Sequence, residues 1–109
     1  MFALPHRVTF YCPSQDANGQ VLQSATVIAQ ETIRELAGRF GGATCQDAQG
    51  AWVNENGQVI QEAVKLIYAA VENVTPDLML WAENWAKHIR DKLDQESVAL
   101  EIDSILYLV

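Results

Sequence analysis

Residues 45–71 read CQDAQGAWVNENGQVIQEAVKLIYAAV. Asn56-Gly57, near the middle of this run, is a strong hairpin signal, because both residues tolerate positive φ and the primed hairpin turns require it. The runs on either side, Cys45–Val53 and Gln58–Val71, have strand character. The run therefore predicts a long β-hairpin at the centre of the chain.

A strand and a helix are expected before the hairpin. Residues 7–12 alternate apolar and polar side chains, and Pro13 ends the alternation. After a polar loop over residues 14–20, apolar residues recur at helical spacing from Ser24 to Phe40. Gly41-Gly42 follows and supplies the left-handed conformation that commonly ends a helix.

A second helix and a last strand are expected after the hairpin. Thr75 is a good N-cap, Pro76 suits the first helical position, and Asp77 complements the helix dipole. This helix is expected to run to about Asp94. Residues 97–109 then predict one final strand, with alternation at Val98, Leu100 and Ile102.

The resulting order is strand, helix, strand, strand, helix, strand. A chain of 109 residues with this order predicts one domain, residues 1–109, of the ferredoxin-like α+β class, βαββαβ. Right-handed crossovers then give a four-stranded antiparallel sheet of order 4-1-3-2 with both helices on one face.

The charge balance excludes some classes of partner. The formal net charge is -7, from 14 acidic and 7 basic residues, and no three basic residues are consecutive. A protein that neutralises phosphates needs clustered Lys and Arg, so we expect no nucleic-acid partner and no membrane-surface role. No run of 18 apolar residues and no signal-peptide pattern is present, so we expect a cytoplasmic protein.

Metal and cofactor chemistry has no motif in this chain. His6, His88, Cys12 and Cys45 do not stand at zinc-ligand spacings, so we expect no metal and no cofactor. Either cysteine could act as a nucleophile with a histidine, but a small buried thiol is the commoner role.

Some apolar strand residues point to self-association. Residues 59–71 are apolar on both faces, yet in this topology the helices cover only one face of the sheet. An apolar surface of this kind is usually an interface, so we expect a homo-oligomer, most simply a dimer. The expected interface residues are Ile67, Ala69, Val71, Ile105, Tyr107 and Val109.

Candidate ligand residues surround the expected cleft. Glu62 lies inside the hairpin and could meet Arg7 or Arg39, although a carboxylate beside an arginine is more often a surface ion pair. Trp52 is either a hairpin-packing residue or the lip of a cleft. The candidate ligand-binding set is Tyr11, Arg39, Trp52, Glu62 and Tyr68.

The hairpin and the C-terminal third resemble a family of small bacterial α+β proteins that is known only as a domain of unknown function. The residues that carry the resemblance are Asp47 to Trp52, Gly57 to Glu62, and Gln95 to Val98. Members often have Ser-Lys after the hairpin glutamate, where this chain has Ala63-Val64-Lys65. The resemblance implies the ferredoxin-like or dimeric α+β barrel class of fold and supplies no activity.

Three functions follow as hypotheses. The leading one is an oligomeric module that binds a ligand or partner without chemistry of its own. The second is a small cofactor-independent enzyme of the dimeric α+β barrel type, since such enzymes need no metal motif. The third is an acidic regulator that occupies a basic protein surface. Whether the chain is an enzyme stays open at this stage.

Overall fold

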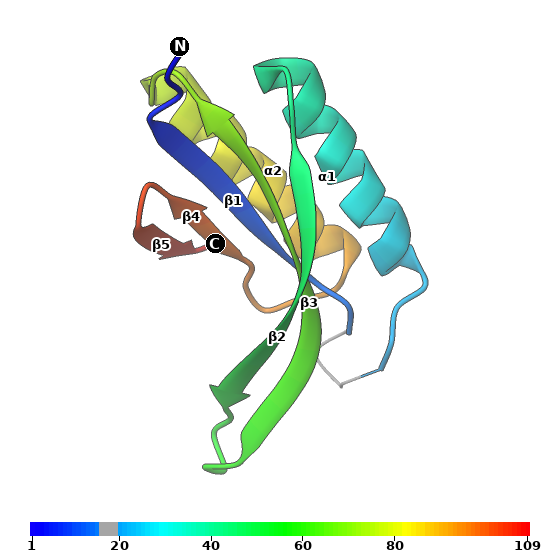
Figure 1. The fold of residues 1–109 in the computed structure, drawn as a ribbon. Helices are drawn as coiled ribbons and strands as arrows, with labels where there is room; N and C mark the ends of the chain where they lie inside the picture. Colours follow the sequence, from blue (N-terminus) through cyan, green and yellow to red (C-terminus); the bar gives the residue numbers. More distant parts are fainter. Residues whose placement is uncertain (16–19) are drawn as a thin grey trace.

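The computed structural model describes residues 1–15 and 20–109 and shows two helices packed on one side of a sheet (Figure 1). The expected loop over residues 14–20 falls largely on residues 16–19, which lie outside the described residues. The elements in chain order are β1 (His6–Pro13), α1 (Ser24–Phe40), β2 (Thr44–Val53), β3 (Val59–Val71), α2 (Pro76–Lys92), β4 (Ala99–Ile102) and β5 (Ile105–Leu108).

The long central hairpin is present. β2 and β3 pair without interruption from Thr44 opposite Tyr68 to Val53 opposite Val59. The turn differs from the expected two-residue primed turn, in which both Asn56 and Gly57 would have positive φ. Only Gly57 does, with φ 76°. Instead the Asn54 side chain accepts hydrogen bonds from the N–H groups of Asn56 and Gln58, both at 2.9 Å. Asn54 thus closes a longer loop.

α1 ends and α2 begins where local sequence chemistry predicts. α1 covers Ser24–Phe40 and stops at Gly41, whose φ of 88° lets its N–H bond to the Ala37 carbonyl. At the start of α2 the Thr75 hydroxyl accepts a hydrogen bond from the Leu78 N–H at 3.1 Å. The N-cap prediction is therefore confirmed.

The predicted four-stranded sheet is wrong. The sheet has five antiparallel strands in the order β2-β3-β1-β4-β5, because residues 97–109 form a short hairpin instead of one strand. Asp103 and Ser104 have φ of 58° and 105° and reverse the chain between Ile102 and Ile105. Asp tolerates this left-handed conformation, but its presence in an apolar alternation did not indicate a turn.

The core lies between the sheet and the helices. Val8, Phe10 and Cys12 of β1 and Ile67 and Ala69 of β3 are at most 2% exposed. Large residues of both helices meet them, including Leu36 of α1 and Ile89 of α2. The other side of the sheet has no helix over it (Figure 1), and we call it the open face.

The outer half of the central hairpin stands away from this core. Residues 48–64, which we call the arm, project past the ends of both helices (Figure 1). The molecule is correspondingly elongated, with principal extents of 48 × 26 × 24 Å. Neither helix covers the arm, so its apolar side chains contribute to the surface.

Within the described residues, neither helix has the length and hydrophobicity that a membrane-spanning segment requires.

Candidate functional site

The open face is formed by alternate residues of the three central strands. Side chains alternate along a strand, so Arg7, Thr9 and Tyr11 of β1 point away from the helices. Thr9 lies opposite Tyr68 and Tyr11 lies opposite Leu66 on β3. Directly opposed residues project to the same side, so Tyr68 and Leu66 belong to the open face as well.

Four of the five expected ligand residues share this face. Tyr11 and Tyr68 lie on the part of the sheet that the helices back, whereas Trp52 and Glu62 lie on the arm. Trp52 is opposite Ile60, and Glu62 is two residues further along the same face of β3. Because Tyr11 is level with Leu66, four residues from Glu62, the two halves are roughly 13 Å apart along the strand.

Arg39 does not join them, so its assignment to this cleft is wrong. It stands at the end of α1, on the helix side of the sheet. Its guanidinium lies over the ring of Trp81 of α2, 4.5 Å from the ring centroid. The apolar side of α1 faces the core, so Arg39, at the end of this helix, lies away from the open face.

The half of the site that contains Tyr11 and Tyr68 has two side-chain pairs that join neighbouring strands. The Tyr11 hydroxyl donates a hydrogen bond of 3.2 Å to Glu101 of β4. Burial, then the hydrogen bond and the negative charge of Glu101, raise the pKa of Tyr11 above its ordinary value. The Arg7 guanidinium lies 4.2 Å from the centroid of the Tyr68 ring. Tyr11 thus remains a neutral donor that holds the Glu101 carboxylate in place.

Sequence reasoning missed Glu101 and the position of Arg7. Arg7 was weighed as an ion-pair partner of Glu62, but it stacks on Tyr68 instead. Glu101 was visible as an acidic residue in an alternating strand, and its register opposite Thr9 places it on the open face. The signal would have been the pairing of β4 with β1, which the sequence alone does not give.

The second half of the site surrounds Glu62 on the arm. Partial burial raises the pKa of the Glu62 carboxyl, because desolvation disfavours its charged form. Neither an ion pair nor a hydrogen bond links its side chain to another part of the described chain. Glu62 is therefore a half-buried carboxylate on an apolar surface that would gain from a cationic ligand.

A gap in the side-chain cover lies directly beside Glu62. The residue opposite it on β2 is Gly50. A Cβ atom built there would lie 3.9 Å from the Glu62 carbonyl oxygen and 3.9 Å from Val64 Cγ1, in ordinary contact. Gly50 thus leaves a shallow flat strip, next to Trp52, on which a planar group could rest.

The expected interface is only partly on the surface. Ile67, Ala69 and Val71 are at most 2% exposed and face the helices, so they belong to the core and their assignment to the interface is wrong. Both faces of β3 are apolar, and the sequence did not show which one the helices cover. Tyr107 and Val109 are half-buried against the core, and Ile105 is exposed.

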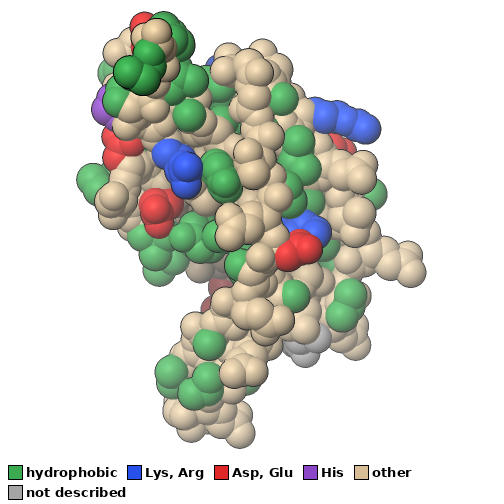
Figure 2. Space-filling view, viewed as in Figure 1, with side chains coloured by type: hydrophobic (Ala, Val, Ile, Leu, Met, Phe, Trp, Pro, Cys, Tyr) green, Lys and Arg blue, Asp and Glu red, His purple; other side chains and the backbone are tan. Residues whose placement is uncertain are grey.

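Apolar side chains other than the expected interface residues are exposed on the open face. Leu106 and Leu108 of β5 are 54% and 74% exposed, and Trp52 is 50% exposed. Their register places Leu106 opposite Glu101 and Leu108 opposite Ala99, on the same face as Tyr11. Figure 2 shows hydrophobic side chains on the body of the molecule and again at the end of the arm.

The cysteines are poor candidates for nucleophiles. Both are free; Cys12 is buried and Cys45 is exposed. Burial raises the pKa of the Cys12 thiol to about 12, so it stays protonated at neutral pH. In the parts of the chain that the structure describes, no three His, Cys, Asp or Glu side chains gather as a metal site would require.

Comparison with known proteins gives a fold and no family. No family model matches the chain, and no curated protein matches it. Among solved structures, the chain is similar to a phage SAM lyase in complex with S-methyl-5'-thioadenosine, with a TM-score of 0.70 and 17% identity over 95% of this chain and 88% of that one. The apo state of a phage SAM lyase gives a TM-score of 0.69 and 20% identity, over 100% of this chain and 94% of that one.

These neighbours correct the leading functional hypothesis. We expected a binding module without catalytic activity, but the two similar solved structures are of an enzyme, which points against that expectation. The absence of a catalytic motif was weak support for it, because a site can be assembled from residues scattered along a chain.

Proposed function

We propose that the protein is a lyase that cleaves S-adenosylmethionine and releases S-methyl-5'-thioadenosine. The observation that carries the proposal is the shared fold, over almost the whole of both chains, with a phage SAM lyase that holds this product. The chemistry of the open face supports it independently.

The reaction can be written without a protein nucleophile. The sulfur of S-adenosylmethionine is a sulfonium cation and therefore a good leaving group. The carboxylate of the substrate attacks its own γ-carbon, the bond from that carbon to sulfur breaks, and the electron pair goes to sulfur. The products are neutral S-methyl-5'-thioadenosine and a lactone that keeps the ammonium group, so no water is consumed and no proton moves.

Such a step needs positioning more than acid–base chemistry. Holding the carboxylate close to the γ-carbon gives the advantage of a well-oriented intramolecular reaction. Opposite charges on the carboxylate and the sulfonium are neutralised as the reaction proceeds, so a site that excludes water favours it. The open face offers apolar side chains for such a site, and it would exclude water once a second copy covers it.

The arm offers one group for each end of this elongated substrate. Glu62 offers a carboxylate to the sulfonium or the ammonium group, and a cation there would offset the desolvation of Glu62. Trp52 offers a face for stacking of the adenine, beside the strip at Gly50. Tyr11 supplies further aromatic surface that attracts a cation, whereas the Tyr68 ring already carries the Arg7 guanidinium.

Self-association over the open face belongs to the same proposal. The exposed apolar residues of β5 and the arm would otherwise face water, and a second copy placed over them would close the site. A homodimer in the cytoplasm, as expected from the sequence, is the simplest form of this arrangement.

Product analysis tests the proposed activity. The purified protein is incubated with S-adenosylmethionine, and both halves of the substrate are followed by mass spectrometry. We expect S-methyl-5'-thioadenosine together with α-amino-γ-butyrolactone. If no S-methyl-5'-thioadenosine forms above the buffer rate, the activity is refuted. If oxygen from labelled water enters the first-formed amino-acid product, the reaction is a hydrolysis and the lyase assignment fails.

A further inference from the structure

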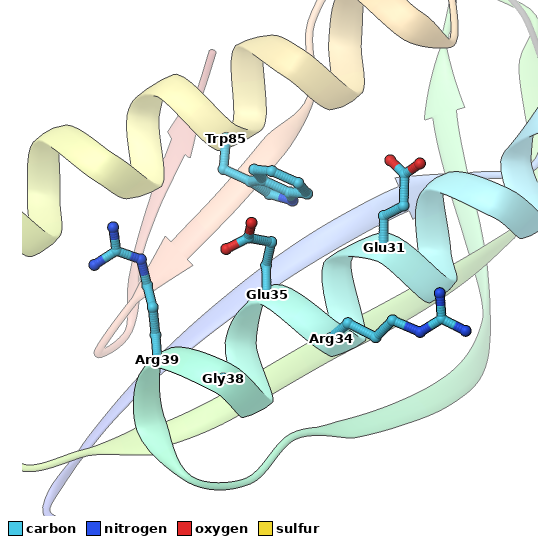
Figure 3. A pocket seen from close by; sticks show the side chains of 6 residues that line it. All are labelled: Glu31, Arg34, Glu35, Gly38, Arg39 and Trp85. Carbon is cyan, nitrogen blue, oxygen red and sulfur yellow. The ribbon is translucent and has the colours of Figure 1, made fainter.

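A groove between the two helices lies on the opposite side of the molecule from the proposed active site. It is a shallow groove of about 660 Å³, open to solvent, and is lined by Glu31, Arg34, Glu35, Gly38, Arg39 and Trp85. Five of these residues come from α1, and Trp85 comes from α2 (Figure 3). The absence of a side chain at Gly38 widens the groove between the two charged turns of α1.

The aromatic wall of the groove is held rigidly. Trp85 donates its indole N–H to the buried Thr32 hydroxyl at 3.0 Å, and Thr32 donates in turn to the Ile28 carbonyl at 2.8 Å. The Trp85 ring is stacked on Trp81 with 6.4 Å between the ring centroids, and its centroid lies 4.8 Å from that of the tilted His88 ring. Trp85 therefore lines the groove without needing a partner for its polar atom.

Two opposite charges in this groove do not pair with each other. Glu35 and Arg39 are four residues apart on α1, a spacing at which Glu and a following basic residue usually attract. On α2 the same spacing joins Glu83 and Lys87 at 3.3 Å. Arg39 instead stacks on Trp81, and Glu35 has no ion pair or hydrogen bond to any described side chain.

The stacked position of Arg39 leaves its donors available. A guanidinium that lies flat on an aromatic ring presents its N–H groups around its edge, where they match a carboxylate. Figure 3 shows Glu35 reaching toward the space below Trp85, Arg39 rising beside Glu35 toward α2, and Arg34 pointing away from both. Glu31 lies 3.7 Å from His88 of α2, whereas Glu35 has no basic side chain within this distance among the described residues.

We propose that this groove binds a free α-amino acid: its carboxylate contacts Arg39, its ammonium group contacts Glu35, and an aromatic side chain lies against Trp85. A donor group and an acceptor group beside one aromatic wall are complementary to a zwitterion with an apolar side chain. The site is distinct from the open face, so the inference stands apart from the proposed lyase activity.

Titration of the ¹⁵N-labelled full chain with L-phenylalanine tests the inference, with the indole N–H signals as reporters. We expect a saturable shift of the Trp85 signal, while the Trp52 signal on the open face stays in place. Glu35→Gln and Arg39→Gln should each weaken binding by about tenfold or more, because each removes one charge-assisted hydrogen bond. Both side chains are exposed, so both variants keep the fold.

Matched controls separate the zwitterion from simpler ligands. Lys92→Gln removes an exposed positive charge at the end of α2, outside the lining of the groove, and should leave the affinity within about twofold. Phenylalaninamide and N-acetylphenylalanine, which each lack one charge, should bind at least about tenfold more weakly. The proposal is overturned if Trp85 shows no saturable shift, if Trp52 shifts instead, or if either Gln variant or either analogue binds as well as the reference.

Discussion

At the scale of single residues, the environment of each ionisable group explains its expected behaviour. Glu62 is half-buried without a partner, whereas Asp103 is exposed but receives hydrogen bonds from His6 and from the Arg7 N–H. Their pKa values therefore move in opposite directions: burial raises the first, and the hydrogen bonds lower the second. Both residues are ordinary in the sequence, and only their partners distinguish them.

Glu62→Gln should not destabilise the free protein. Because the pKa of Glu62 is higher in the folded state, its ionisation costs stability in full above the folded pKa, and the cost declines as the pH falls and is gone below the unfolded pKa. At pH 7 the variant should unfold at the same temperature as the wild type or higher by at most about 2 °C, since solvent screens the half-exposed group. A clear loss of thermal stability at pH 7, measured by circular dichroism, would show that Glu62 has a stabilising partner.

The two thiols should differ in reactivity. Cys12 is buried with a pKa of about 12, whereas Cys45 is exposed. In the native protein at pH 8, a thiol reagent such as DTNB should therefore titrate Cys45 quickly and leave Cys12 unmodified until the chain is unfolded. The variant Cys45→Ser serves as the control and should give no fast reaction. Rapid modification of Cys12 in that variant would contradict the burial.

At the scale of elements, local signals predicted the helices well and the end of the sheet poorly. Gly41 and the Thr75-Pro76 pair act through contacts within one or two turns, so the helix limits could be read from neighbouring residues. The turn at Asp103 has no Gly, Pro or Asn, and it depends on His6 and Arg7 from the other end of the chain. Such a long-range interaction leaves no local pattern.

Asp103→Asn should destabilise the β4–β5 hairpin and its junction with β1 at neutral pH. The pKa of Asp103 is lowered in the folded state, so its carboxylate contributes stability above the unfolded pKa, and the contribution is lost as the pH falls through the folded pKa. Asn tolerates positive φ, so the turn itself is preserved. The midpoint of thermal unfolding should fall below that of the wild type at pH 7, and the difference should vanish in acid. An equal difference at both pH values would contradict the electrostatic explanation.

At the scale of the whole molecule, the sequence named candidate residues without showing how they lie together. Tyr11, Trp52, Glu62 and Tyr68 share one face because of the strand register, which the structure supplies. Alternation could not tell which apolar face of β3 the helices cover, so Ile67 was placed on the wrong side. The resemblance to a domain of unknown function stays a prediction, since no comparison bears on it.

Leu106→Asp should convert an oligomer into a folded monomer. Leu106 is 54% exposed on the open face, where a charge would oppose the burial that association requires. Val27→Asp is the matched control, because Val27 is 56% exposed but lies on α1, away from that face. Light scattering should report a dimer for the wild type and for Val27→Asp. A monomeric wild type, or a dimer of Leu106→Asp, would refute association through the open face.

The central claim is that Glu62 and the open face carry out the cleavage of S-adenosylmethionine. The most direct test compares kcat/KM for the release of S-methyl-5'-thioadenosine by the wild type, Glu62→Gln and Glu72→Gln. Glu72 is exposed just after β3, so its variant makes the same change in charge outside the site. We predict a fall of about tenfold or more for Glu62→Gln, the loss expected when a charged contact to the substrate is removed, and no such fall for Glu72→Gln. Equal kcat/KM values for all three proteins would contradict the account.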